Sequence, residues 1–377
     1  MPVIVDSAGG LVLASPIDAP NPLPRFHNSA VDGYAVCSAD IAAADRTRPV
    51  SLPVRHHIAA GSPTPMTFTP GTTDKIMTGA PIPAGANSVV PLEIVERRGA
   101  TVLFERPARA GANVRVTGED IALGSRVLDR GTVLGPLHIG LLAALGVDKV
   151  SVRRRIRVAI VSTGSEITRG PKSLRFGEIY ESNSVMLATA VSACGADVVA
   201  CESVSDSVPL FRAVLDRVCT VADVVITTGG VSAGDHEVVK AALRGQDQMR
   251  FGGVAMSPGK PQGAGRIDGA ALLAFPGNPL AAYVSFELFA RPLLRAAMGL
   301  ADDERPTVTA RLAHPVTTTV GRTNIYLARR DTAGTITLAS GTNRHGLGGV
   351  LGADCFVEID QDTTDLVRGH PVTARLL

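Results

Sequence analysis

The sequence of 377 residues contains no tryptophan, and only 4% of its residues are aromatic. Base stacking on aromatic side chains is therefore disfavoured as a mode of nucleic-acid binding. Lysine and arginine number 37 against 35 for aspartate and glutamate, a formal net charge of +2. No general field attracts nucleic acid or an anionic membrane, so any anion must be bound locally.

Cysteine and histidine patterns are equally sparse. The chain has five cysteines with no C-x-x-C pair and eight histidines with no H-E-x-x-H spacing, so a disulfide framework, a zinc site and a Ser-His-Asp triad all lack support. We expect the cysteines to be reduced core residues. The start, MPVIVDSAGG, lacks the features of a signal peptide, and no apolar run approaches about 18 residues. The sequence predicts a cytoplasmic protein with no membrane insertion.

The length predicts two to four domains, because single cores rarely grow to this size. Residues 1–20 are predicted to form a β-ribbon turning at residues 7–10, and residues 122–150 a strand pair with a short helix that pairs back with it. Residues 25–121, rich in Gly, Pro and Thr, predict a small, mostly β domain. The segment from residue 305 to the end predicts a small β-barrel.

From Arg155 the pattern changes to alternating strands and helices. Apolar, β-branched runs predict strands at RVAIVST, DVVACESV, DVVIT and ALLAF, with helices near 183–194, 208–220, 237–243 and 279–298. This alternation is typical of a three-layer α/β domain with a largely parallel sheet.

Three of these strands end in polar, glycine-bearing turns. The turns begin at Thr163-Gly164, at Gly229-Gly230 with Ser232 beyond, and at Pro276-Gly277 with Asn278 and Pro279 beyond. Ligands of open parallel sheets bind beyond the carboxyl ends of the strands, so we expect the three turns to converge on one crevice. Backbone N–H groups of such turns suit phosphate.

Carboxylates follow the same strand ends. Glu166, Asp206, Asp235 and Glu237 suit Mg²⁺ held partly by protein and partly by substrate phosphate, although each one alone equally suits a helix cap or a solvated turn. Lys260, in the stiff segment Pro258–Pro261, is a candidate anion contact that lacks the spacing of a P-loop. In the first half of the chain, segments 28–35 and 77–83 are loops that either line a site or stiffen the small domain.

Eight spaced segments together resemble one family, the MoeA family of molybdopterin molybdenumtransferases, which also includes the E domain of gephyrin. They are NSAVDGYAV (28–36), IMTGAPIPAGANSVVPLE (76–93), NVRVTGEDI (113–121), VSTGSE (161–166), IYESN (179–183), TGGVSAGD (228–235), PGKP (258–261) and PGNP (276–279). The resemblance runs in order along nearly the whole chain.

The resemblance implies Mg²⁺-dependent insertion of molybdate into adenylylated molybdopterin with release of AMP, the final step of molybdenum cofactor biosynthesis. Roles carried over with it place Glu166, Asp206 and Asp235, with Glu237, at the metal and nucleotide. Gly229, Gly230 and Ser232 are implied at phosphate, Lys260 at an anion, and Thr163, Pro276, Asn278 and Pro279 along the substrate. Asp32, Thr78, Arg115, Glu119 and Asp120 are implied on the small-domain side.

The resemblance further implies an elongated multidomain chain of the α/β plus β class with four regions. These are a linking β-ribbon domain (1–22 and 122–150), a small mostly β insert domain (23–121), an α/β molybdopterin-binding domain resembling MogA (151–303) and a C-terminal β domain resembling a barrel (304–377). It implies a homodimer in which the active site is shared, so that Asp32 and Thr78 reach the crevice of the partner chain. Molybdopterin adenylyltransferase and molybdoenzymes are further partners that it suggests.

Several positions depart from the family pattern. Family members usually begin with an additional helix, Glu237 stands where Asp is usual, Ser257 replaces a frequent Lys, and residues 345–349 lack the usual serines. Two alternatives therefore stand beside the insertase: a catalytically weakened, gephyrin-like paralogue that acts as a dimeric scaffold, and the preceding adenylyltransferase. The flanking motifs disfavour the adenylyltransferase, which shares only the α/β domain.

Overall fold

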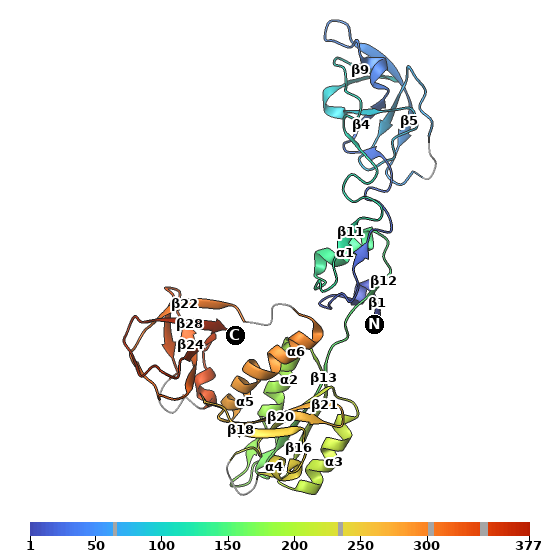
Figure 1. Ribbon diagram of the computed structural model, residues 1–377. Helices are drawn as coiled ribbons and strands as arrows, with labels where there is room; N and C mark the ends of the chain where they lie inside the picture. Colours follow the sequence, from blue (N-terminus) through green and yellow to red (C-terminus); the bar gives the residue numbers. More distant parts are fainter. Residues whose placement is uncertain (63–65, 233–236, 301–304, 340–345) are drawn as a thin grey trace. The chain divides into compact units, whose positions relative to one another are not determined.

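The computed structural model describes residues 1–62, 66–232, 237–300, 305–339 and 346–377. The chain folds into two compact units (Figure 1). Unit 1 comprises residues 1–9 and 13–152, and unit 2 comprises residues 10–12 and 153–377. Within the described ranges, no helix is long and apolar enough to cross a membrane. The finer division into four regions stays a prediction.

Unit 2 contains a six-stranded sheet in the order β16-β13-β17-β21-β20-β18. Its strands are β13 (Arg157–Thr163), β16 (Asp197–Val204), β17 (Val224–Thr228), β18 (Met249–Gly253), β20 (Pro261–Ile267) and β21 (Ala270–Phe275). The first four strands in the order are parallel to one another. Strand β20 is antiparallel to β21, and β18 is antiparallel to β20. Because β13 and β17 are covered on both faces, their residues are buried almost without interruption, and each strand contains an apolar run, Val158–Val161 and Val224–Ile226. The prediction of a largely parallel sheet is confirmed.

Helices cover both faces of this sheet (Figure 1). One core packs α3 (Val208–Cys219) and α4 (Val238–Leu243) on the sheet through residues such as Phe211 and Val239. The other core packs α2 (Asn183–Ala193) and the helical segment 279–298 through residues such as Leu187, Phe286 and Leu294. Two separate cores, one on each face, make three layers, as the sequence predicts.

The helical segment after β21 is interrupted. It consists of α5 (Pro279–Ser285), a π-helical turn at Phe286–Ala290, and α6 (Arg291–Met298). The π turn places Glu287, whose side chain is only 2% exposed, against Arg305 at 2.8 Å. This ion pair ties the helix to the start of the C-terminal strands.

The C-terminal strands close into a five-stranded barrel. They are β22 (Thr307–Leu312), β24 (Thr323–Arg330), β25 (Thr335–Leu338), β26 (Cys355–Ile359) and β28 (Pro371–Leu376). Their order, β24-β25-β22-β28-β26, closes because β26 pairs back with β24. The short strand β19 (Met256–Ser257) adds to β24 and so connects the barrel with the α/β sheet. Shorter elements are β23 (Val316–Thr317), β27 (Asp365–Leu366) and a 3₁₀ turn at Leu347–Val350.

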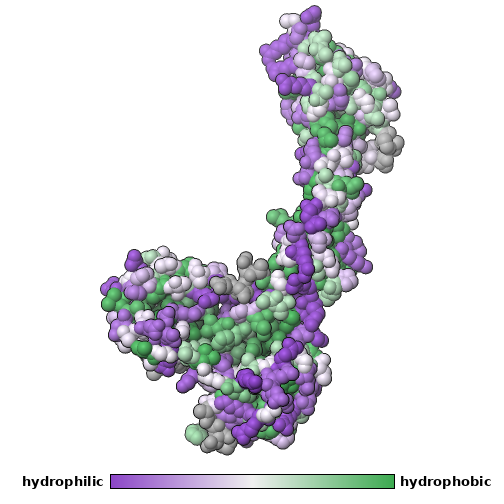
Figure 2. Space-filling view, viewed as in Figure 1, coloured by the Kyte–Doolittle hydropathy of each residue, from purple (hydrophilic) through white to green (hydrophobic). Residues whose placement is uncertain are grey.

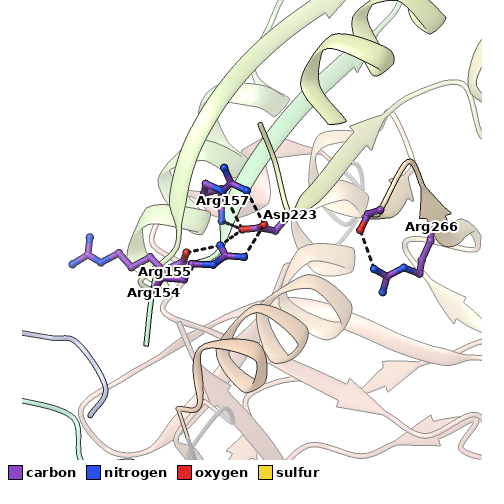
Figure 3. A network of polar contacts seen from close by, with 6 residues as sticks. Arg154, Arg155, Arg157, Asp223 and Arg266 are labelled. Atoms are coloured by element: carbon purple, nitrogen blue, oxygen red, sulfur yellow. Dashed lines mark hydrogen bonds and ion pairs between the residues drawn. The ribbon is translucent and has the colours of Figure 1, made fainter. Parts of the chain in front are cut away.

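The chain enters the α/β domain through an arginine-rich segment anchored by one carboxylate. Asp223, 19% exposed, precedes β17 and accepts hydrogen bonds from Nη2 of Arg154 at 2.9 Å and from Nη2 of Arg157 at 3.1 Å. Figure 3 shows both guanidinium groups directed at Asp223, with the Arg155 side chain pointing away. Arg154, with a smaller contribution from Arg157, holds the pKa of Asp223 far below its usual range, although desolvation of the carboxylate acts in the opposite direction.

Unit 1 contains a second six-stranded sheet in the order β7-β4-β6-β5-β9-β8. The strands are β4 (Gly33–Val36), β5 (Val50–Ile58), β6 (Thr73–Ile76), β7 (Ser88–Pro91), β8 (Glu96–Arg98) and β9 (Thr101–Phe104). Short pairs join β1 (Pro2–Ile4) to β12 (Lys149–Ser151), β2 (Ile17–Asp18) to β11 (Arg126–Leu128) and β3 (Asn28–Ser29) to β10 (Val114–Arg115). One helix, α1 (Pro136–Ala144), lies between β11 and β12.

The predicted hairpin of residues 1–20 is wrong. Val5–Ser7 form a 3₁₀ turn, and β1 finds its partner in β12 instead of in the next segment. The pairing of this opening segment with residues 122–150 is confirmed. The backbone groups of β1 and β2 are satisfied by strands more than a hundred residues away, so no local turn is needed.

The cysteines form no disulfide, and Cys194, Cys219 and Cys355 are buried. Desolvation raises the pKa of the Cys219 thiol to about 11 and that of Cys355 to about 12. Both thiols are therefore protonated near neutral pH and behave as small apolar core groups.

Apolar residues also gather on the outside of unit 2. Figure 2 shows hydrophobic surface over the region that Figure 1 assigns to α2, α5 and α6. Val185 on α2 is 65% exposed and Leu293 on α6 is 42% exposed. An apolar face of this kind is typical of a surface that another protein covers.

Candidate functional site

A cavity of about 430 Å³ lies at the carboxyl ends of β13, β17 and β21 in unit 2. Its walls come from the turns after these strands, from the turn after β16 and from the segment that leads into α2. Lining residues are Thr163, Gly164, Glu166, Ile167, Ile179–Asn183, Asp206, Gly229–Ser232, Glu237, Pro261 and Pro276–Pro279. The expected convergence of the three polar strand ends is confirmed.

The turns after β13 and β16 are tied together by reciprocal hydrogen bonds. The N–H of Ser165 donates to Oδ2 of Asp206 at 3.0 Å, and the N–H of Asp206 donates to the Ser165 hydroxyl at 3.1 Å. The Glu166 carboxylate folds back over Gly164, where an added Cβ would lie 2.7 Å from Oε2. Two carboxylates, Glu166 and Asp206, therefore lie in the same wall of the cavity.

The turn after β17 requires glycine at two positions. Gly229 has a φ of +86°, and a Cβ there would lie 2.6 Å from the carbonyl oxygen of Thr163. Gly230 has a φ of +67°, and its Cβ would lie 2.9 Å from the backbone nitrogen of Val239. The backbone can thus approach both the neighbouring strand and α4 closely, which leaves the turn open toward the cavity.

A third carboxylate comes from the residue before α4. Oε2 of Glu237 accepts a hydrogen bond from the N–H of Ser232 at 2.6 Å, and Nζ of Lys240 donates to the Ser232 carbonyl at 2.5 Å. Ser232 and Glu237, both predicted site residues, therefore lie together in the cavity wall. Asp235, another predicted site residue, lies outside the described residues.

The loop after β21 adds Pro276, Asn278 and Pro279 to the cavity wall. Asn278 caps α5, because its Oδ1 accepts from the N–H of Ala281 at 3.0 Å, and Pro279 follows at the first helical position. The backbone N–H of Gly229 donates to the carbonyl of Phe275 at 3.1 Å. This bond holds the loop beside the glycine turn.

Residues 179–183 line the cavity although no role was predicted for them. Glu181 accepts hydrogen bonds from the N–H of Ser184 at 3.1 Å and from its hydroxyl. Asn183 is 6% exposed, and its Nδ2 donates to the carbonyl of Gly277 at 2.8 Å. The signal available in the sequence was a polar cluster, Glu-Ser-Asn, directly before an apolar helix.

Lys260 lies beside the cavity. It is exposed in the loop between β19 and β20, and its side chain packs next to Gly253, while the following Pro261 reaches the cavity wall. The loop is connected to α5, because Nε2 of Gln262 donates to the Gly259 carbonyl and to the Ser285 hydroxyl, each at 2.7 Å.

The small-domain residues belong to unit 1. Oδ1 of Asp32 accepts from both the N–H and the hydroxyl of Thr78, each at 2.7 Å. These two donors hold the pKa of Asp32 below its usual range, so the carboxylate is ionised at neutral pH. Arg115 ends β10 and is exposed. The structure thus brings Asp32 and Thr78 together, and their meeting with a cavity of unit 2 stays a prediction.

The donor chemistry of the cavity suits a hard cation. In the part of the chain that the structure describes, no three His, Cys, Asp or Glu side chains come together as a ready-made metal cluster. Mg²⁺ keeps several waters and usually takes one or two protein carboxylates together with substrate phosphate. Glu166, Asp206 and Glu237, spread over one cavity wall, fit that kind of site.

Models of two protein families match the chain. The MoeA N-terminal region (domain I and II) matches residues 1–146, and a probable molybdopterin binding domain matches residues 159–296. The second match contains β13 to β21 and therefore most of the cavity wall.

Whole proteins match along nearly their full length. Molybdopterin molybdenumtransferase 2 of Mycobacterium tuberculosis is 44% identical over 374 residues, covering 97% of this chain and 92% of that protein. Molybdopterin molybdenumtransferase 1 of the same organism is 31% identical over 400 residues, covering 100% and 94%. The crystal structure of a molybdopterin biosynthesis MoeA protein from Pyrococcus horikoshii is 29% identical, covers 100% of this chain and 94% of its own, and has a TM-score of 0.87. The chain therefore belongs to the MoeA family of molybdopterin molybdenumtransferases.

Proposed function

We propose that this chain is a molybdenum insertase that transfers molybdenum from molybdate to adenylylated molybdopterin and releases AMP, the final step of molybdenum cofactor biosynthesis. The observation that carries the proposal is the cavity that places Glu166, Asp206 and Glu237 around the open glycine turn Gly229-Gly230. In the overall reaction two Mo–S bonds form and the phosphoanhydride bond breaks. Two S–H bonds and two Mo–O bonds break at the same time. One of the two oxygens that leave molybdate is released as water with the two thiol protons, and the other is taken up at the cleaved phosphoanhydride.

Charge decides how the substrate is held. Adenylylated molybdopterin and molybdate are both anions, and a cavity lined by four carboxylates, Glu166, Glu181, Asp206 and Glu237, repels them unless a cation lies between. We assign Mg²⁺ to this position, with Glu166 and Asp206 as ligands, Glu237 beside them, and Asp235 as the predicted residue outside the described ranges. A cation held there by these residues would supply Lewis-acid chemistry at the phosphoanhydride.

The chain's own groups do the positioning. The turn at Gly229–Ser232 lines the cavity, and we assign phosphate oxygens to the N–H groups of Gly230 and Val231. The N–H groups of Gly229 and Ser232 already donate to the Phe275 carbonyl and to Glu237. Thr163 and the loop of Pro276, Asn278 and Pro279 line the same cavity, and we assign the flat pterin to this part of its wall. Lys260 beside the cavity supplies positive charge for the incoming molybdate. Most of the rate acceleration is therefore expected from orientation and fixed charge.

A homodimer completes the proposal. In this proposal the cavity of one chain receives Asp32 and Arg115 from the partner chain. Thr78 keeps Asp32 ionised, and Glu119 and Asp120 lie near Arg115 in the sequence. The apolar face with Val185 and Leu293 is the kind of surface that a second copy would bury. Molybdopterin adenylyltransferase, which supplies the substrate, and molybdoenzymes, which receive the product, remain the proposed protein partners.

The test is AMP release from adenylylated molybdopterin, measured with Mg²⁺ and with or without molybdate. The wild-type chain should release AMP over repeated turnovers only when molybdate is present. Glu166→Gln and Asp206→Asn should each lower the rate by about a hundredfold, the loss typical of a group that stabilises transition-state charge. Asp247→Asn, an exposed carboxylate outside the cavity, is the matched control and should leave the rate unchanged.

A scaffold protein would give a different result. If the wild-type chain binds the nucleotide but releases no AMP, the insertase proposal is contradicted, and the gephyrin-like scaffold becomes the better account of this chain.

A further inference from the structure

Asn183 connects the start of α2 with the loop after β21. It is the first residue of α2, it is 6% exposed, and it lines the cavity together with Gly277. Its Nδ2 donates to the Gly277 carbonyl at 2.8 Å and lies 3.4 Å from the Thr228 hydroxyl. A carbonyl only accepts, so this contact fixes which way the amide points.

Below the cavity, Asn183 is part of a buried polar network that links three strand ends. The Thr228 hydroxyl, at the end of β17, donates to the Ser162 hydroxyl of β13 at 3.3 Å. The Thr163 hydroxyl donates to the Thr228 carbonyl at 3.2 Å. Asn183 extends this network to the third strand end, since Gly277 follows β21 by two residues. Satisfied networks of this kind rigidify a site.

Gly277 packs closely against the other glycine turn of the cavity. An added Cβ at Gly277 would lie 3.4 Å from the Cα of Gly229, so the two glycine turns are already in van der Waals contact. Both turns line the cavity, so the way they pack against each other contributes to its shape. Among the described residues, Asn183 supplies the side-chain hydrogen bond that holds the Gly277 carbonyl.

Half of the Asn183 amide is unsatisfied. Its Oδ1 is buried and has no hydrogen-bond partner in the described part of the chain. An unsatisfied buried acceptor is unfavourable, and a catalytic or binding role is one of the explanations for such a group in a native structure.

We propose that Asn183 is a positioning residue of this active site, which acts through Gly277 to hold the loop of residues 276–279 in the position in the cavity wall that adenylylated molybdopterin requires. The kinetic part of this inference rests on the proposed function. The structural part, that the Asn183 amide fixes the loop, does not.

The direct test is hydrogen exchange of the unliganded protein. Asn183→Asp keeps the size of the side chain but replaces the donor by an acceptor that faces the Gly277 carbonyl. Backbone amides of Gly277 and Asn278 should exchange about five- to tenfold faster in this variant, the change expected when one hydrogen bond is lost. Asn183→Ala, which adds no charge, should also increase the exchange rates of these amides. It replaces the aspartate variant in the experiment if that variant does not fold.

Asn21→Asp is the matched control. Asn21 also donates from Nδ2 to a backbone carbonyl, that of Leu145, at 2.9 Å, but it lies in unit 1 and outside the cavity. It should lower thermal stability without changing exchange at Gly277 and Asn278. Unchanged exchange at these amides in both Asn183 variants would overturn the proposal.

The kinetic readout separates positioning from stability. In the AMP-release assay at 25 °C, both Asn183 variants should raise KM for adenylylated molybdopterin about tenfold with a smaller change in kcat, and Asn21→Asp should change neither. A folded Asn183 variant with faster loop exchange but wild-type KM would show that loop position does not matter for the substrate, and the proposal would be wrong. If the wild-type chain releases no AMP, the proposed function fails, while hydrogen exchange still decides whether Asn183 fixes the loop.

Discussion

Asp223 is a single carboxylate on which the entry of the chain into the α/β domain depends. It lies outside the cavity and accepts from Arg154 and Arg157, so its effect is on stability. Asp223→Asn should lower the free energy of unfolding at pH 7 by about 1–3 kcal/mol, because two guanidinium groups lose a charged, partly buried partner.

The pH dependence of this difference has a defined sign. The pKa of Asp223 is lowered in the folded protein, chiefly by Arg154, so its stabilisation is present above the unfolded carboxyl pKa of about 4 and is lost as pH falls below it. Urea unfolding of both proteins between neutral and acidic pH checks this. A difference between wild type and variant that stays constant down to pH 3 would contradict the assigned charge interaction.

Individual site residues differ in how well the sequence alone predicts them. Thr163, Gly229 and Pro276 were predictable, because each ends or directly follows a buried strand and parallel strands must end at one edge. Glu181 and Asn183 were missed as site residues. They follow the short strand pair β14 (Ile167–Thr168) and β15 (Ile179–Tyr180), which is not part of the six-stranded sheet. The rule that ligands bind at the ends of the sheet's strands therefore does not identify them.

At the scale of elements, the turn after β17 is the most constrained part of the site. Gly229→Ala combines a φ of +86° with a Cβ only 2.6 Å from the Thr163 carbonyl oxygen, so a strand end must move. Thermal unfolding should show a loss of about 2–4 kcal/mol. Gly245→Ala, with a φ of +82° and open space around the new Cβ, is the control and should lose only about 1 kcal/mol. Equal losses for both would mean that the close approach of β13 and β17 carries no energy.

The elements themselves were largely predictable where the pattern is local. The α/β strands and helices follow from apolar runs and their spacing, and the predicted helix near 279–298 is continuous apart from its π turn. The opening hairpin failed for a physical reason. An isolated two-stranded ribbon is only marginally stable in water. Strand β1 is instead stabilised by β12, a partner that the neighbouring sequence does not identify.

At the scale of the whole molecule, the proposed shared site can be tested by mixing variants. Asp32→Ala lies in unit 1 and Glu166→Gln in unit 2. If the partner chain supplies Asp32, each homodimer is inactive, whereas a mixed dimer contains one intact site. Equal amounts of both variants, allowed to exchange subunits, should then recover about a quarter of the wild-type rate, since half of the dimers are mixed and each has one working site of two. No recovery, with subunit exchange confirmed by mass spectrometry, would argue that both residues act within one chain.

The central claim is that the chain makes active molybdenum cofactor, and delivery of that cofactor tests it most directly. Purified protein, adenylylated molybdopterin, Mg²⁺ and micromolar molybdate are incubated with a molybdoenzyme in its apo form, and the activity of that enzyme is measured. The account predicts activation that depends on molybdate, exceeds one cofactor per chain and is lost in Glu166→Gln. Full binding of adenylylated molybdopterin without any activation of the apo-enzyme would contradict it.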